Sequence, residues 1–126
     1  MKPIEDQKNL GLYDQIGHAF IAKAVAEFYK RAFVDVMICH FFFNSDINHI
    51  ITEQTSFVSA MLGGPKSYTG KPLKPAHKPF LIRTVHFNRR QVMMREVLVD
   101  LNLEPHLANA WLAVEEQFRN VIVNAG

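Results

Sequence analysis

The sequence predicts an all-α fold with four main helices, and three features of the chain support this prediction. Apolar residues recur at helical spacing in four long segments, no segment alternates like a half-buried strand, and turn-forming residues such as Asn44-Ser45-Asp46 and Gly63-Gly64-Pro65 separate segments. With 126 residues, 48% of them hydrophobic, and ten phenylalanines, the chain has a single-domain length and can bury a substantial core. We therefore treat residues 1–126 as one domain, with residues 1–9 as a polar, frayed N-terminal extension.

Two helices are predicted on either side of Gly17. Residues 10–17 provide one or two helical turns that end at this glycine. From Ala19 to about Val36, apolar positions form one stripe and charged residues occupy the other side, as in an amphipathic helix. Tyr29 lies at the edge of the apolar stripe, so its ring can be buried while its hydroxyl requires a partner inside.

A phenylalanine run at residues 41–43 is predicted to form a packed corner. Three adjacent rings cannot share one face of a helix, so at least one must leave the ordinary core face. A flat ligand would give such a ring a surface to pack on. Ser45 or Asp46 is expected to cap the helix that follows.

The second long helix should run from about Ile47 to Leu62, with an inner stripe that is apolar except for Gln54. A buried amide without a partner costs on the order of 1–3 kcal/mol. Gln54 should therefore bond another side chain, such as Tyr29, or serve a bound ligand.

Two further long helices complete the prediction. One should open at Phe87 or Asn88 and continue to about Asn102, and the other should begin at Pro105 and end within residues 124–126. In the first of these we expect apolar side chains to point inward and the arginines at 89, 90 and 95 to point outward.

His77 lies in a segment, residues 71–80, that cannot form a long helix. Prolines at positions 72, 75 and 79 each lack an amide donor and favour extended conformations in the preceding residue. A histidine in such a short, stiff element is suited to being held in place and directed at a target. Our hypothesis is that the target is a haem iron.

Charge is unevenly distributed, although the net charge is only +2. No Asp or Glu occurs from Gln54 through Arg95, and eight Lys or Arg residues fall within that window. A pair of haem propionates would suit such a region. The alternatives are a solvated basic face or nucleic acid, and the absence of a nucleic-acid motif argues against the latter.

The single Cys39 excludes an internal disulfide and is consistent with a reducing compartment. No apolar run reaches the roughly 18 residues of a membrane span, and the N-terminus lacks the apolar core of a signal peptide. A cytoplasmic protein without a membrane partner is therefore expected.

Other metal or nucleophile chemistry is not indicated. His49 and Glu53 form a pair at helical spacing, but on the wrong side of the inner stripe for a zinc or non-haem iron site. Cys39 has only the adjacent His40 and no nucleophile signature around it. The histidines at 18, 40, 86 and 106 are interpreted as surface or satisfied residues.

Several short features occur in an order and spacing that resemble the truncated haemoglobins, over nearly the whole chain. These features are Leu12-Tyr13, Phe28-Tyr29, Phe41-Phe42, Gln54, Phe57, Gly63-Gly64, Tyr68, His77 and Pro79-Phe80. The second and third groups of that family place a tryptophan on the third long helix, whereas the only tryptophan here is Trp111 on the last one. This favours the first group. A departure from the family is Gly17-His18, where members usually carry a glycine pair.

The resemblance implies a two-over-two helical sandwich around haem b (iron protoporphyrin IX). His77 matches the proximal iron ligand and Phe42 the phenylalanine that packs on the haem face. Tyr29 matches the tyrosine whose hydroxyl reaches the iron-bound ligand, and Gln54 the glutamine that supports it. Ile50 falls where other globins often place a distal polar residue.

The remaining residues expected around the haem are Phe57, Tyr68, Lys74, Phe80 and Ile82. Lys74, Lys78 or Arg83 is expected to pair with the propionates. Phe57, Val58 and Met61 are candidates for lining a ligand route, although their default role is core packing.

The function that follows from the resemblance is reversible binding of O2 and of other diatomic ligands, CO and NO, by a monomer or weak dimer. One alternative is an enzyme, an NO dioxygenase or a peroxidase, that uses the same haem with a separate reductase. A second alternative is a haem-based or haem-free helical sensor or interaction module.

Overall fold

The structure is a computed structural model that describes residues 11–65 and 80–125. Within these ranges the regular structure is entirely helical, without a strand, and the all-α prediction is confirmed. The helices are α2 (Leu12–Ile16), α3 (His18–Ala32), the 3-10 helix η1 (Cys39–Phe42), α4 (Ile47–Met61), α6 (Thr84–Asp100), α7 (Pro105–Glu116) and α8 (Arg119–Ile122).

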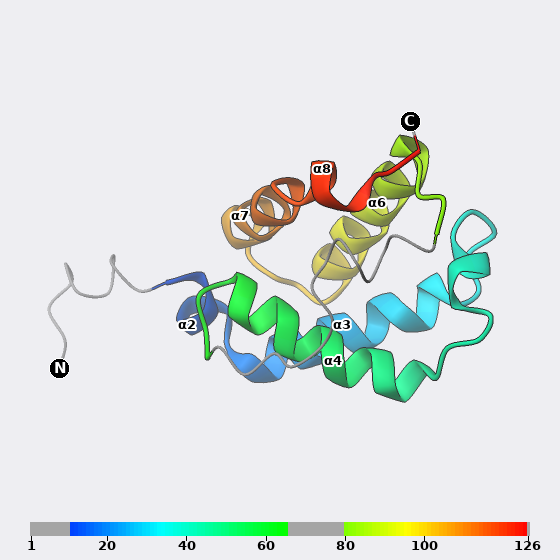
Figure 1. Ribbon diagram of the computed structural model, residues 1–126. Helices are drawn as coiled ribbons and strands as arrows, with labels where there is room; N and C mark the ends of the chain where they lie inside the picture. Colours follow the sequence, from blue (N-terminus) through cyan, green and yellow to red (C-terminus); the bar gives the residue numbers. More distant parts are fainter. Residues whose placement is uncertain (1–10, 66–79, 126) are drawn as a thin grey trace, which may run out of the picture.

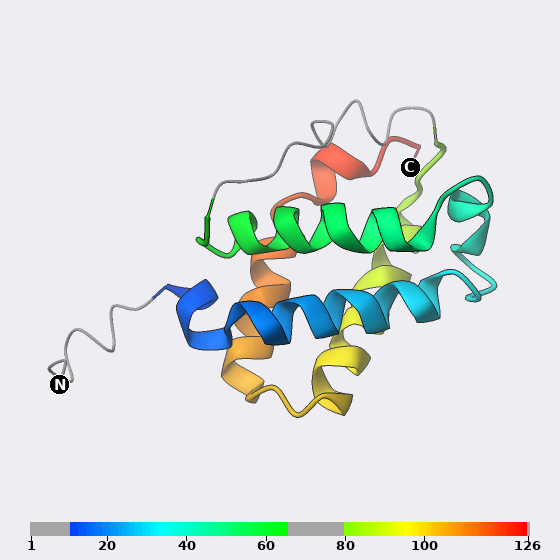
Figure 2. The same cartoon turned by 90° about the horizontal axis from the view of Figure 1, so that it is seen from below.

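The four long helices form two antiparallel pairs that cross each other (Figures 1 and 2). Helix α3 runs beside α4, and α6 runs beside α7. Helix α3 also packs against α6 and so joins the two pairs. The resulting arrangement is two helices over two.

The core is centred on the apolar stripe of α3. Ile21, Ala24, Val25 and Phe28 follow helical spacing, and none of them is more than 2% exposed. They pack with buried side chains of α6 and α7, among which Trp111 is 0% exposed. Complete burial of an aliphatic or aromatic side chain of this size stabilises the fold by about 1.5–3 kcal/mol.

The ends of three helices differ from the sequence-based prediction. Helix α3 ends at Ala32 instead of Val36, and Val36 is 90% exposed in the turn that follows. Helix α6 begins at Thr84, because the His86 side chain accepts a hydrogen bond from the Arg83 backbone N–H and caps the first turn. The predicted last helix is divided into α7 and α8.

Gly17 marks the end of α2 and Asp46 caps the start of α4, as predicted. Gly17 follows α2 with φ +92°, a conformation that L-residues with a Cβ rarely adopt. The Asp46 carboxylate accepts hydrogen bonds from the backbone N–H groups of Asn48 and His49, at 2.9 and 3.3 Å, and caps α4.

Gly64 allows the chain to approach α2 closely after α4. A Cβ at this position would overlap the ring of Tyr13. The backbone N–H of Tyr13 donates to the carbonyl oxygen of Leu62 at 3.0 Å, so α2 is fastened to the end of α4.

In the described ranges no helix combines the length and the apolar character that crossing a bilayer would require.

Candidate functional site

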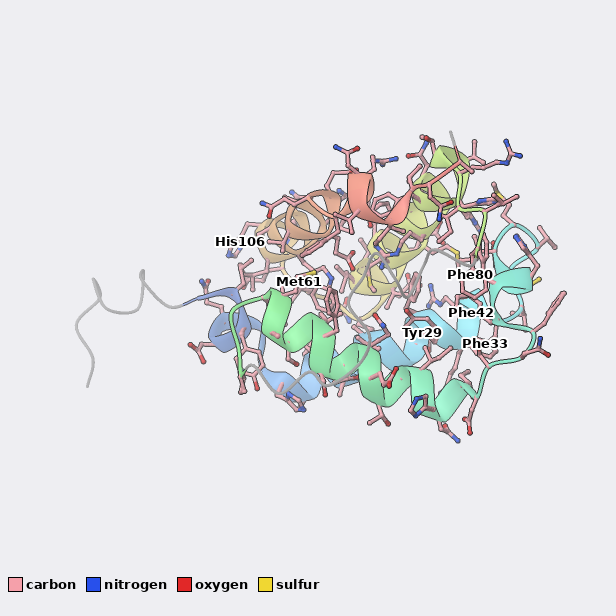
Figure 3. All side chains as sticks on the ribbon, viewed as in Figure 1. Tyr29, Phe33, Phe42, Met61, Phe80 and His106 are labelled. Carbon is pink, nitrogen blue, oxygen red and sulfur yellow. The ribbon has the colours of Figure 1, made fainter. Side chains whose placement is uncertain are left out.

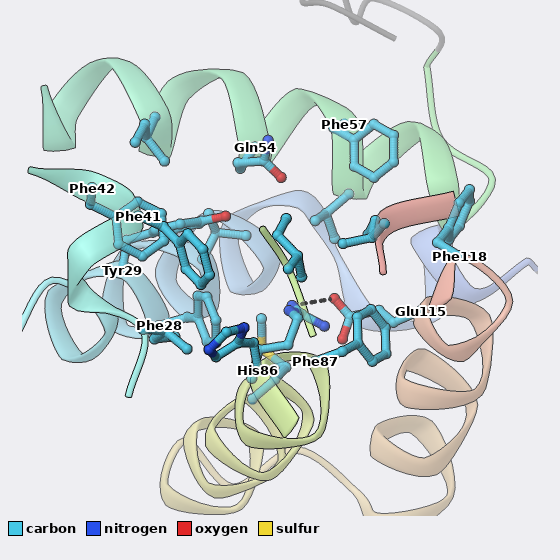
Figure 4. Close-up of a pocket in the computed structure, with 18 of the residues that line it drawn as sticks. Phe28, Tyr29, Phe41, Phe42, Gln54, Phe57, His86, Phe87, Glu115 and Phe118 are labelled. Carbon is cyan, nitrogen blue, oxygen red and sulfur yellow. Dashed lines mark hydrogen bonds and ion pairs between the residues drawn. The ribbon is translucent and has the colours of Figure 1, made fainter. Parts of the chain in front are cut away.

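A cavity of about 250 Å³ lies between the two helix pairs. Its walls come from α3, α4, α6 and α7, and η1 and residues 80–82 contribute further side chains. Figure 4 shows the aromatic rings of Phe28, Phe41, Phe42, Phe57 and Phe118 around this space. The lining is therefore largely apolar and rich in flat surfaces.

The inner stripe of α4 faces this cavity. Ile50, Gln54, Phe57 and Met61 all line it, and each is only half-buried. Val58, which also lines the cavity, is the one hydrophobic side chain of α4 that is fully buried. The stripe thus borders a space and is only partly covered, since Phe57 and Met61 also pack against the edge of the core.

Tyr29 projects from α3 into an aromatic cluster at one end of the cavity. Its ring lies edge-on to Phe28, at a centroid distance of 5.0 Å, and to Phe42, at 5.8 Å. Phe42 in turn stacks on Phe33 at 4.9 Å, and Figure 3 shows these rings together at the end of α3. The position of the Tyr29 ring is fixed by these contacts on two sides.

The phenylalanine run divides between the cavity and solvent. Phe41 and Phe42 line the cavity, and Phe41 lies edge-on to Phe80 at 5.9 Å. Phe43 is 77% exposed. The expectation that one of the three rings leaves the core face is confirmed.

Gln54 is the polar residue of α4 that lines the middle of the cavity wall (Figure 4). In the described ranges its side chain makes no hydrogen bond, so of the two expected roles the bond to Tyr29 is not observed. Its amide remains able to donate to a molecule in the cavity.

Seven of the residues predicted from sequence to surround a ligand do line this one cavity. They are Tyr29, Phe42, Ile50, Gln54, Phe57, Phe80 and Ile82. His77, Tyr68 and Lys74 lie outside the described residues, as does Lys78. Arg83 is exposed and does not line the cavity.

Arg90 was expected to point outward, and this prediction is wrong. Its guanidinium lines the cavity, with Cζ 5.1 Å from the ring centroid of Phe28 and 5.8 Å from that of Phe87. A sequence signal for this exists, because position 90 follows Phe87 by three residues and precedes Met94 by four. The prediction followed the positive charge of Arg90, which favours solvent, and not its helical spacing from Phe87 and Met94.

Glu115 on α7 is the partner of Arg90. Nη2 of Arg90 lies 2.9 Å from Oε2 of Glu115, the contact dashed in Figure 4, and the Glu115 side chain is only 7% exposed. Burial alone would lower the pKa of Arg90, but the Glu115 charge and hydrogen bond outweigh burial and raise it. The cavity wall therefore carries a buried, oppositely charged pair that sequence reasoning missed.

The second oxygen of that carboxylate is unusual. Oε1 of Glu115 is buried, and no hydrogen-bond partner for it is found in the ranges 11–65 and 80–125. A buried acceptor without a donor is costly, so this oxygen indicates a site for a donating group.

His86 is a further cavity residue that was interpreted as a surface or satisfied histidine. It is half-buried, and its ring lies 5.0 Å from that of Phe41. Burial lowers its pKa, and the nearby charges of His40 and Arg83 lower it further, so the ring is neutral at pH 7. Because Nδ1 accepts from the Arg83 backbone, the proton resides on Nε2.

These residues fit a flat, mostly apolar group that carries a polar centre. Aromatic walls, a half-exposed α4 stripe, the hydrogen-bonding groups of Tyr29 and Gln54, and the unpartnered Glu115 oxygen surround one space. A haem matches this combination of apolar faces and a coordinating centre.

Comparisons with known proteins agree with this geometry. The model of a family described as bacterial-like globin matches residues 11–124. A group 1 truncated haemoglobin from Tetrahymena pyriformis is 33% identical over 109 residues, which cover 86% of this chain and 90% of that protein.

Solved structures show the same helix arrangement. The crystal structure of the truncated haemoglobin from Tetrahymena pyriformis, in its Fe(III) form, matches with a TM-score of 0.87 and 30% identity over 91% of this chain and 99% of that one. The 2/2 haemoglobin from a Synechococcus species, in the cyanomet state with covalently attached haem, matches with a TM-score of 0.85 and 25% identity over the same shares. The predicted two-over-two helical fold is confirmed.

Proposed function

This chain belongs to the bacterial-like globin family, as a truncated (2/2) haemoglobin of group 1, and we propose that it holds haem b in the cavity and binds O2 reversibly. Haem-based ligand binding follows from the family. The observation that carries the proposal for this cavity is the half-exposed α4 stripe, which faces Tyr29 across an aromatic-walled space. The iron of a bound haem would supply the coordination position for a diatomic ligand.

His77 is proposed as the proximal ligand. A neutral imidazole must ligate iron through one ring nitrogen while its other N–H is held by a partner. The resemblance of residues 68–80 to the family supports this assignment, and the prolines on both sides of His77 limit the backbone conformations open to the segment.

Tyr29 and Gln54 are proposed to hold the ligand by hydrogen bonds. Both line the cavity, and the Tyr29 ring is held by Phe28 and Phe42. Ile50, also in the wall, adds an apolar surface and no donor. Each hydrogen bond in a pocket that excludes water should stabilise bound O2 by about 1 kcal/mol or more. CO and NO are proposed to occupy the same place.

Absorption spectroscopy tests the haem site. Purified protein mixed with haem should give a Soret band whose position changes among the ferric, ferrous and CO-bound forms. His77→Ala should lose or strongly alter these spectra, whereas His106→Ala, at an exposed position on α7, should leave them unchanged. Absence of a Soret band in the wild type would favour the haem-free sensor, and an unaltered His77→Ala spectrum would exclude His77 as the ligand.

Stopped-flow measurement of O2 dissociation tests the two donors. Tyr29→Phe and Gln54→Leu should each accelerate dissociation by about fivefold, the equivalent of 1 kcal/mol. Tyr13→Phe is a matched control, because Tyr13 packs against Gly64 and does not line the cavity. Equal rates in all four proteins would exclude a role for these donors.

A further inference from the structure

We propose that Arg90 and Glu115 form a binding site for small weak acids in the cavity wall, where Arg90 holds the anion and Oε1 of Glu115 accepts the proton. The ligand class is an acid HX whose conjugate base binds ferric haem, such as hydrazoic acid or hydrogen fluoride. The inference rests on the proposed haem site, because iron and Arg90 would hold the anion together.

The geometry places both groups in the wall of the ligand cavity. Arg90 reaches it from α6 and Glu115 from α7, and their contact at 2.9 Å leaves the carboxylate with one free oxygen within the described ranges. The guanidinium lies over the rings of Phe28 and Phe87, which limit its freedom to swing away. Both groups therefore remain beside the space that a ligand occupies.

A purely structural ion pair would be expected to satisfy both carboxylate oxygens. The amide of Gln91, next to Arg90 in sequence, accepts from Nη1 of Arg90 and donates to the carbonyl oxygen of Leu112 at 3.3 Å. Neither of these two bonds involves Oε1 of Glu115, which stays buried without a donor in the described residues. The oxygen is thus available to a proton brought in by a ligand.

The unpartnered oxygen explains why the ligand should be an acid instead of a bare anion. An acid supplies the proton that Oε1 of Glu115 lacks, whereas an anion alone would leave this buried acceptor without a donor. The raised pKa of Arg90 keeps it cationic, so it can hold the anion. In the proposed step the H–X bond breaks, X⁻ stays at Arg90, and H⁺ goes to Oε1. No electron is transferred and the net charge of the site is unchanged.

Other titratable groups around Glu115 have partners or are neutral. From α6, His86 is neutral because burial lowers its pKa. Glu116 at the end of α7 is bonded to Arg119 of α8 at 2.6 and 2.9 Å, and these two charges balance. Tyr29 contributes its phenol hydroxyl from α3. The titratable side chains of α4, His49 and Glu53, do not line the cavity.

The test is azide binding to the ferric, haem-loaded protein, followed by the change in its absorption spectrum. If each bound azide takes up one proton, the azide affinity of the wild type should fall about tenfold per pH unit between about pH 5.5 and 7.5. Glu115→Gln removes the proton acceptor, and its azide affinity should be nearly independent of pH. Arg90→Met combined with Glu115→Gln should bind azide more weakly than Glu115→Gln alone.

A matched control is Asp35→Asn, which removes a carboxylate bonded to the neighbouring Arg89 on α6, outside the cavity lining. It should retain the pH slope of the wild type. A slope that persists in Glu115→Gln would overturn the proposal.

Infrared spectroscopy of the wild type makes the test independent of the stability of the variants. Azide binding should produce the C=O stretch of a protonated carboxylic acid, and the band should be absent from Glu115→Gln where that variant holds haem. A wild type that binds azide without this band and without proton uptake would contradict the inference. If no Soret band forms, the proposed haem site itself is wrong. A Soret band together with azide binding that takes up no proton would contradict only the acid-binding site.

Discussion

Helices α3 and α4 are both 15 residues long and amphipathic, yet their inner stripes have different surroundings. On α3, Ile21 is 0% exposed and is enclosed by side chains of the other helices. On α4, Ile50 occupies an equivalent inner position but remains half-exposed at the cavity wall. The difference shows that an apolar stripe indicates a buried face without showing whether protein or a ligand covers it.

The largest expected effect comes from truncating the same residue type on the two helices. Ile21→Ala should reduce the free energy of unfolding by about 2–5 kcal/mol, because it opens a void in packed core. Ile50→Ala in the haem-free protein should cost less than about 1 kcal/mol, because its side chain already borders a space. Urea denaturation of both variants measures the difference. Equal losses would show that the α4 stripe is packed as tightly as that of α3.

The next largest loss of stability is expected at Asp35. This residue follows α3 closely, and its carboxylate joins that end of the helix to α6. Both Nε and Nη2 of Arg89 donate to its Oδ1, at 3.1 and 2.7 Å, and Asp35→Asn should cost about 1–3 kcal/mol at neutral pH. These hydrogen bonds hold the pKa of the Asp35 carboxyl below its ordinary value, and they outweigh the opposite effect of burial.

The pH dependence of this effect follows from the direction of the shift. A pKa lowered in the folded state gives stability that is present above the unfolded-state pKa and is lost as pH falls through the folded-state pKa. The difference between wild type and Asp35→Asn should therefore shrink below about pH 4. Denaturation curves recorded across this range check it, and a constant difference would contradict the assignment.

A smaller effect is expected at the start of α4. Asp46→Ala removes the acceptor for two backbone N–H groups and should reduce stability by about 1 kcal/mol. Thermal unfolding monitored by circular dichroism measures it, with Asn44→Ala as an exposed neighbouring control. A change no larger than the control's would mean that the cap is dispensable.

The smallest effect is expected on the outer face of α4. His49 and Glu53 contact each other at 3.1 Å, but their side chains are 68% and 41% exposed. Glu53→Gln should alter stability by less than about 0.5 kcal/mol, because solvent weakens an exposed pair. A substantially larger loss in urea denaturation would show that the outer face also contributes to holding α4.

Much of this fold and part of the site could be predicted from local sequence patterns. Helical spacing located α3 and α4 and placed Gln54 on the inner stripe of α4, which borders the cavity. Phe42, expected from the family resemblance, also lines the cavity. The helix predictions succeed because periodicity and capping depend on residues a few positions apart.

Arg90, Glu115 and His86 could not be placed in the same way. The ion pair joins residues 25 apart in sequence, and each member has a charge that normally favours solvent. Only the packing of α6 on α7 makes burial of the pair possible. His86 caps a helix with its imidazole, in a position where a glutamate or glutamine is the recognised signal.

Trp111, enclosed in the core of this protein, is its only tryptophan and therefore a single intrinsic fluorophore. Its emission should shift to longer wavelength when unfolding admits water to the ring. Haem absorbs in the region where tryptophan emits, so loading of the neighbouring cavity should quench that emission by energy transfer. One unlabelled side chain would then report both the integrity of the fold and the fraction of molecules that carry haem.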